Sequence, residues 1–163
     1  MAALRDLPVV AMISKRSDMW PCCDGKVEML QEKDWQIQVG AAASELADLI
    51  AVSANPLPDD YLSYLNFSDG GEGPLSIHPL WLVLDNASFV AHSLREGTFA
   101  EFFPGLVVIG SNGAGEAIAF DFRRGVANGI VHFDMTNIDL TESIQPLATS
   151  FTELMFLVTP RGA

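Results

Sequence analysis

The chain of 163 residues contains little cysteine and no long apolar run. Its two cysteines, Cys22 and Cys23, are adjacent, which excludes a disulfide framework and the spacing of a CxxC redox or zinc motif. A reducing, cytoplasmic compartment is therefore expected. Apolar runs such as residues 7–13 are far shorter than the roughly 20 residues of a membrane-spanning helix, so we expect no membrane association. That run also lacks a small-residue cleavage site, which argues against a secretory signal.

Basic side chains are also scarce. Nine Lys and Arg stand against 21 Asp and Glu, and the formal net charge is −12. Such a charge repels phosphate backbones, so direct nucleic-acid binding is not expected. No Lys or Arg occurs between Lys33 and Arg95, and this basic-free stretch should present an acidic surface. Its acids are Asp34, Glu45, Asp48, Asp59, Asp60, Asp69, Glu72 and Asp85. An acidic surface serves solubility in many proteins, and it can also complement a basic partner.

Hydrophobic residues make up 49% of the chain, which is enough for one folded domain. Residues 1–28 have no sustained periodicity and are interrupted by Pro8, Pro21 and Gly25. We interpret them as a poorly ordered N-terminal extension or an overlong translation start. Residues 29–163 are predicted to form the single domain.

Apolar spacing and capping residues predict four helices in this domain. They are expected from Ala43 to before Pro56, from Pro58 through Leu65, from a cap at Asp85 or Asn86 to Gly97, and from a capping box at Ser150 to before Pro160.

Short apolar or alternating runs predict strands at residues 80–84, 106–109, 117–122 and 130–135. The glycine-rich segment 110–115 lies between two of these strands. A phosphate-binding loop would be followed by a helix and would often carry a Lys, so we predict a hairpin turn instead. The glycine-rich segment 69–74 is predicted to be a loop.

Residue types that carry chemistry form no catalytic or metal motif in the sequence. The histidines are isolated from one another and from both cysteines: His78, His92 and His132. We assign no metal and no cofactor, because such histidines are usually only hydrogen-bonded, although the fold can still bring them to Asp121 or Asp134. A hydrolase that pairs Asp121 with Glu116 or Asp134 stays open. Acids are so abundant that some must meet by chance, and an enzyme is therefore not favoured.

Several motifs occur in the order typical of one family. They are residues 57–61, 69–73, 109–116 running into 119–121, and 148–154. In this order, over roughly residues 41–158, the chain resembles the SUKH superfamily, which includes fungal Smi/Knr cell-wall-assembly regulators and many bacterial immunity proteins. Positions within these motifs are expected to have structural roles: Leu57, Pro58, Tyr61, Gly70, Gly71, Gly110, Gly113, Gly115, Asp121 and Phe151.

The resemblance implies an α+β fold, with N-terminal helices packed on a mainly antiparallel sheet and a closing C-terminal helix. It also implies a non-enzymatic role, since bacterial members bind and block a cognate toxin, often a nuclease. A nuclease carries a basic groove for phosphates, which an acidic face can occupy as a nucleic-acid mimic. We predict that this face includes Asp59, Asp60, Asp69 and Glu72. Tyr61 or Tyr64 would be anchors if exposed, although the core is the preferred place for Tyr61.

Three functions remain open at this point. The first is an immunity protein that binds a basic toxin domain in the cytoplasm and needs no cofactor. The second is a regulatory scaffold of the Smi/Knr type. Such a scaffold usually has disordered flanking arms, and this chain has almost none beyond residues 1–28. The third is a small hydrolase.

Overall fold

The computed structural model describes residues 30–162. Within this range, five helices and one seven-stranded sheet form an α+β domain, as predicted. Every pair of neighbouring strands is antiparallel, and the seven strands follow one another in the sheet in the order in which they occur in the chain. The predicted extension at residues 1–28, including both cysteines, lies outside the described residues.

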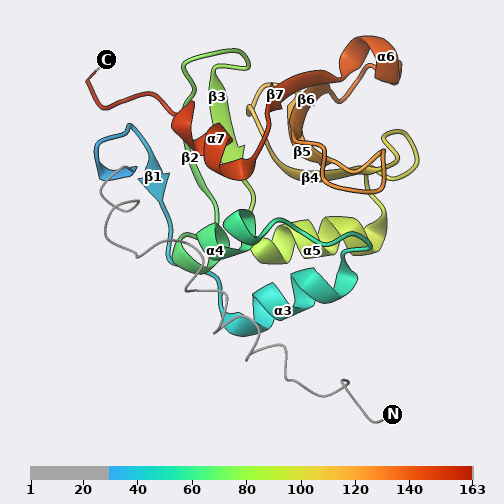
Figure 1. The fold of residues 1–163 in the computed structure, drawn as a ribbon, viewed down its shortest axis with the longest axis horizontal. Helices are drawn as coiled ribbons and strands as arrows, with labels where there is room; N and C mark the ends of the chain where they lie inside the picture. Colours follow the sequence, from blue (N-terminus) through green and yellow to red (C-terminus); the bar gives the residue numbers. More distant parts are fainter. Residues whose placement is uncertain (1–29, 163) are drawn as a thin grey trace.

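Three helices gather at one side of the strands (Figure 1). They are α3 (Ala43–Val52), α4 (Asp59–Phe67) and α5 (Ala87–Glu96). Helices α3 and α5 pack together, and Arg95 on α5 bonds both carboxylate oxygens of Asp48 on α3 at 2.8 and 2.9 Å. All three helices confirm the predictions made from apolar spacing and capping residues.

The caps of α5 and of the closing helix α7 (Phe151–Phe156) follow the sequence signals. The Asn86 side chain accepts a hydrogen bond from the Phe89 amide, and Gly97 ends α5 in the left-handed conformation. At α7, the Ser150 hydroxyl accepts from the amide of Glu153, as a capping box requires. The Glu153 carboxylate bonds the residue before the cap instead of the cap itself.

The strands include the four that the sequence predicts and three that it does not. Their bounds are β1 (Gln36–Ile37), β2 (Gly71–Pro74), β3 (Trp81–Leu84), β4 (Leu106–Ser111), β5 (Glu116–Asp121), β6 (Ile130–Asp134) and β7 (Gln145–Ala148). The sequence predicts neither the strands β1, β2 and β7 nor the short helix α6 (Leu140–Ser143).

The prediction of a loop at residues 69–74 holds for Asp69 and Gly70 but is wrong for the rest, because Gly71–Pro74 forms β2 between β1 and β3. Glycine normally weakens a strand, but here it permits a close approach of neighbouring groups. A Cβ on Gly71 would lie 2.9 Å from the indole of Trp35, and one on Gly73 would lie 2.3 Å from the carbonyl oxygen of Asp34. The glycines therefore let β1 and the Trp35 ring pack directly on β2.

The sheet is buried on both faces of its central strands. On β5, Ile118 and Phe120 belong to the larger core, which the helices cover, while Ala117 and Ala119 belong to a smaller core on the other face. The smaller core also contains Phe103, Val131 and Phe133, among other residues. Among residues 30–162, no helix is long and apolar enough to cross a membrane.

Candidate functional site

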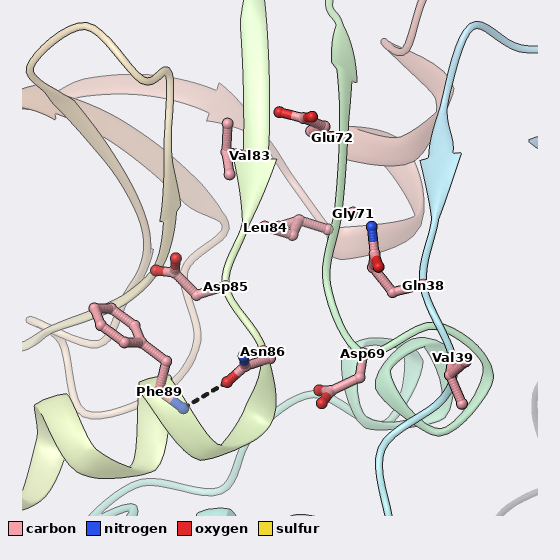
Figure 2. Close-up of a pocket in the computed structure, with 10 residues that line it drawn as sticks. All are labelled: Gln38, Val39, Asp69, Gly71, Glu72, Val83, Leu84, Asp85, Asn86 and Phe89. Carbon is pink, nitrogen blue, oxygen red and sulfur yellow. Dashed lines mark hydrogen bonds between the residues drawn. The ribbon is translucent and has the colours of Figure 1, made fainter.

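An open pocket lies where β2 begins and β3 ends, beside the first turn of α5 (Figure 2). Its volume is about 550 Å³. The lining combines carboxylates with apolar groups, among them Val39, Asp69, Glu72, Val83, Asp85 and Phe89. Its lining residues in the described part of the chain all come from the basic-free stretch, so none of them is a Lys or an Arg. The predicted acidic surface therefore has a concave part.

Asp85 is the pocket acid whose pKa departs most from its ordinary value. It connects β3 to α5, and its amide donates a hydrogen bond to the carbonyl of Ile109 at 2.9 Å. Burial raises the pKa of its carboxyl to about 6. Within residues 30–162, no group donates a hydrogen bond to this carboxylate. The charge is thus partly desolvated, and no cation from this part of the chain compensates it.

Asp69 and Glu72, both predicted to bind a partner, line the same pocket. Asp69 Oδ1 accepts from the amide of Ala87 at 2.7 Å and so holds the first turn of α5. Burial raises the pKa of the Asp69 carboxyl, the charge of Glu45 raises it further, and the bond from Ala87 opposes the rise. Glu72 is half-buried and faces Val83 across the β2–β3 pair.

Asp59 and Asp60, the other two predicted partner-binding residues, do not line this pocket. Both belong to the first turn of α4. Asp60 Oδ2 accepts from the amide and the hydroxyl of Thr152 at 2.9 and 3.0 Å, which ties α4 to α7. The structure thus brings together half of the predicted set and gives Asp60 a bond that supports the fold.

The two tyrosines of α4 are core residues and are not exposed anchors. Tyr61 and Tyr64 are both 0% exposed. The hydroxyl of Tyr64 accepts from the indole nitrogen of Trp35 at 2.9 Å and donates to the carbonyl of Gly70 at 2.8 Å. The alternative of an anchoring Tyr64 is therefore wrong, and the preferred interpretation of Tyr61 is confirmed. Both rings contact Phe151, with centroids 5.2 and 5.1 Å away.

The remaining motif residues lie in turns and in the core. Gly113 and Gly115 have φ values of 70° and 107° in the turn between β4 and β5, which confirms the hairpin prediction. Gly110 belongs to β4, and a Cβ there would lie 2.2 Å from the carbonyl oxygen of Val83. Leu57 is buried, and Pro58 is the N-cap of α4.

Asp121, the centre of the hydrolase alternative, is bonded to Arg123. Its carboxylate accepts from the backbone amide, Nε and Nη2 of Arg123 at 3.0, 2.9 and 2.8 Å. The side-chain bond from Arg123 is the main reason why the pKa of Asp121 is lowered. The Asp134 carboxylate accepts from Thr136, and hydrogen bonding there likewise lowers its pKa. Two carboxylates held in their charged form by separate partners do not resemble an acid–base pair.

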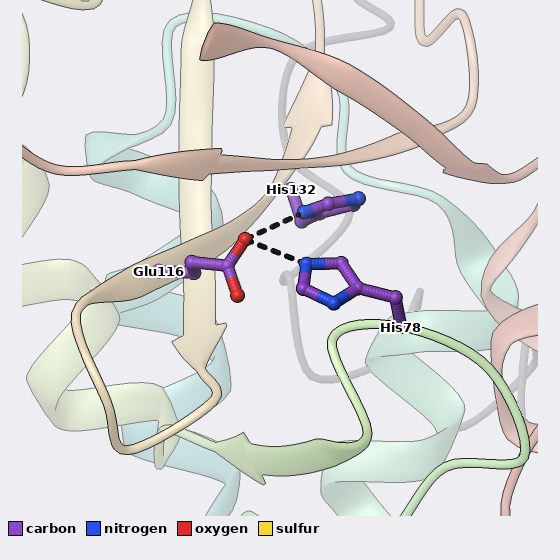
Figure 3. A group of neighbouring side chains, drawn as sticks. All are labelled: His78, Glu116 and His132. Carbon is purple, nitrogen blue, oxygen red and sulfur yellow. Dashed lines mark hydrogen bonds and ion pairs between the residues drawn. The ribbon is translucent and has the colours of Figure 1, made fainter. Parts of the chain in front are cut away.

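A second polar group contains His78, Glu116 and His132 (Figure 3). Glu116 Oε1 lies 2.9 Å from His78 Nε2 and 3.2 Å from His132 Nδ1. His78 and His132, which are far apart in the sequence, therefore lie close together in the fold. Pairing of β5 with β6 brings Glu116 near His132, and the loop between β2 and β3 brings His78. His92 is exposed on α5, outside this group.

A comparison with protein-family models supports the resemblance that the ordered motifs indicate. The model described as the SMI1 / KNR4 family (SUKH-1) matches residues 40–156, which include every described helix and all strands except β1. No curated protein matches the chain. Because the matched segment is well over half of the chain, the protein belongs to the SMI1 / KNR4 family (SUKH-1).

Proposed function

We propose that this protein is a non-enzymatic immunity protein, which neutralises a cognate toxin by binding a basic surface of that toxin in the acidic pocket. Membership of the SMI1 / KNR4 family supports a binding domain of the Smi/Knr or immunity type. The observation that carries the rest of the proposal is the Asp85 carboxylate, which lines the pocket and has no cation partner among residues 30–162. Burial raises the pKa of this carboxyl to about 6. A Lys or Arg from a partner would stabilise its charged form.

The apolar part of the pocket supports a protein partner. Phe89 is 55% exposed and Val39 is 90% exposed, and both lie at the acidic lining. Protein interfaces combine such aromatic and aliphatic contacts with charged groups that fix the orientation. A nuclease toxin fits this description, because its substrate groove must be basic and an acidic partner can occupy it.

The regulatory scaffold of the Smi/Knr type remains the second candidate, since it would use a binding surface of the same kind. The hydrolase finds no support in Asp121, whose carboxylate is occupied by Arg123. Identification of the partner separates the first two functions. Purification of the protein from its native host, followed by identification of the chain that elutes with it, should yield a basic toxin domain if the proposal is correct.

The pocket itself is tested by removing three charges with little change of shape. The variant Asp69→Asn, Glu72→Gln, Asp85→Asn keeps an acceptor for the Ala87 amide. The matched control neutralises three exposed acids outside the pocket: Glu96→Gln, Glu101→Gln and Glu142→Gln. Both variants have the same net charge, so a difference between them reports position alone.

We expect the pocket variant to weaken toxin binding at least about tenfold and to reduce its salt dependence, because close charge pairs at interfaces contribute strongly. The control should bind nearly as the unmodified protein does. Growth rescue on co-expression with the toxin should follow the same order. Equal binding by the two variants would show that the pocket is not the docking site. A separate Asp59→Asn variant tests whether the docking face extends to the first turn of α4, as the sequence predicts.

A further inference from the structure

Three potential metal ligands meet at one end of the β5–β6 pair, although the sequence separates them. His78 comes from the loop between β2 and β3, Glu116 begins β5, and His132 lies within β6 (Figure 3). One ligand atom of each residue lies within 4.8 Å of those of the other two. The two imidazole rings have centroids 4.9 Å apart. Two imidazoles and one carboxylate form a ligand set that zinc enzymes use.

The spacing is close to what a tetrahedral ion requires. With metal–ligand bonds of 2.0–2.1 Å, neighbouring ligand atoms lie about 3.3 Å apart. The distances from Glu116 Oε1 to His78 Nε2 and to His132 Nδ1, 2.9 and 3.2 Å, already approach this value. The Glu116–His78 distance has to lengthen slightly, and the two histidine nitrogens, which lie within 4.8 Å of each other, have to settle at the same spacing. The His78 side chain is 63% exposed on its loop and can make this adjustment, whereas that of His132 is only 10% exposed.

The carboxylate is oriented by a residue behind it. Asn112 Nδ2 donates to Glu116 Oε2 at 2.7 Å, which leaves Oε1 directed at the histidines. Asn112 is itself held, because its Oδ1 accepts from the amides of Ala114 and Glu116 at 2.8 and 3.0 Å. Metal-ligating carboxylates are usually oriented in this way by an outer partner.

We propose that His78, Glu116 and His132 bind one Zn²⁺ ion, and that water completes the coordination on the exposed side of His78. Imidazole nitrogen and carboxylate oxygen suit zinc better than they suit calcium or magnesium, which prefer all-oxygen sites. Without the ion, each facing nitrogen can donate a hydrogen bond to Glu116 Oε1. With the ion, the same nitrogens offer lone pairs, and the ring protons sit on the opposite nitrogens. The ion would fasten the loop between β2 and β3 to the β5–β6 pair.

The test is calorimetric titration of the full chain with ZnCl₂ after removal of metals by a chelator. The background carries Cys22→Ser and Cys23→Ser, because adjacent thiolates can bind zinc by themselves. His78→Ala removes an exposed ligand with little risk to folding, and Glu116→Gln removes the charge while keeping an oxygen. His92→Ala is the matched control, since His92 is exposed and lies outside the group.

We expect one Zn²⁺ per chain and a rise in melting temperature when it binds. His78→Ala should weaken the affinity by at least about tenfold, which is the lower limit even for outer partners of zinc ligands, and should abolish the rise in melting temperature. His92→Ala should change neither. The proposal is wrong if the parent chain shows no saturable binding, or if His78→Ala and His92→Ala bind Zn²⁺ equally. If Glu116→Gln fails to fold, the comparison of the two histidine variants decides by itself.

Discussion

Replacing Asp85 by Asn should make the protein more stable at neutral pH. Burial raises the pKa of the Asp85 carboxyl from an ordinary 3.8 to about 6 in the folded protein. This difference corresponds to about 3 kcal/mol at most, and to about 1 to 2 kcal/mol after allowance for the solvent that still reaches the carboxylate. The charged form is therefore more costly in the folded protein than in the unfolded chain. An Asn of nearly the same shape removes that cost.

The sign of the pH dependence follows from the folded state having the higher pKa. Well above pH 6 the carboxylate is charged in both states, so the destabilisation is complete. As the pH falls from 6 toward 3.8, the folded protein takes up its proton first, and the destabilisation disappears. The advantage of Asp85→Asn should therefore be largest at pH 7 to 8 and close to zero near pH 4.

Urea unfolding of both proteins at pH 7.5, 6.0 and 4.5 measures this difference in the free energy of unfolding. Glu142→Gln is a suitable control, because Glu142 is exposed on α6 and lies outside the pocket. The control should differ little from the parent protein at every pH. An Asp85→Asn variant that is no more stable at pH 7.5, or that keeps the same advantage at every pH, would refute the account of Asp85 as a desolvated charge.

Three further substitutions test the packing around the pocket by the same urea assay. Tyr61→Phe should raise the free energy of unfolding by about 1 kcal/mol, because the buried Tyr61 hydroxyl has no hydrogen-bond partner in the part of the chain described; a lower stability would reveal a missed partner. Tyr64→Phe should lower it by about 1 to 3 kcal/mol, because it removes a bond to the Gly70 carbonyl; no loss would contradict that bond. Gly73→Ala should lower it by about 1 to 3 kcal/mol or more, because its Cβ would lie 2.3 Å from the Asp34 oxygen, and an unchanged stability would show that β1 can move away.

The sequence predicts those elements whose signals are local. Helix α5 has its cap, apolar stripe and terminal glycine within a dozen residues, and the β4–β5 hairpin has its turn between two alternating runs. Strand β1 has only two residues and therefore no period to detect. Strand β2 is missed for a different reason: glycine usually weakens strands, and the ring of Trp35 that requires it here comes from elsewhere in the chain.

The contrast between local and non-local sequence signals also applies to the acidic pocket and to the group of His78, Glu116 and His132. The basic-free stretch points to an acidic surface before any fold is known, and Asp69, Glu72 and Asp85 all belong to it. Charge counting cannot tell which of these acids is desolvated, because burial depends on the junction of β3 with α5. The histidine group has a weaker sequence signal still, since Glu116 lies 38 residues from His78 and 16 from His132. A register for β5 and β6 would have suggested one of these contacts, but not the other.

Four acids of the basic-free stretch divide into two pairs with different hydrogen bonding, and this difference makes the proposed function testable. Asp60 and Asp69 accept hydrogen bonds from backbone amides at the first turns of α7 and α5. Replacing either residue therefore lowers the stability of the fold as well as removing a negative charge. Within the described chain, Glu72 and Asp85 hold no backbone group in this way, yet they line the pocket. Neutralising only these two should therefore weaken partner binding without lowering stability. If the protein keeps an unfavourable charge because binding requires it, the variant should become more stable and should bind its partner less tightly.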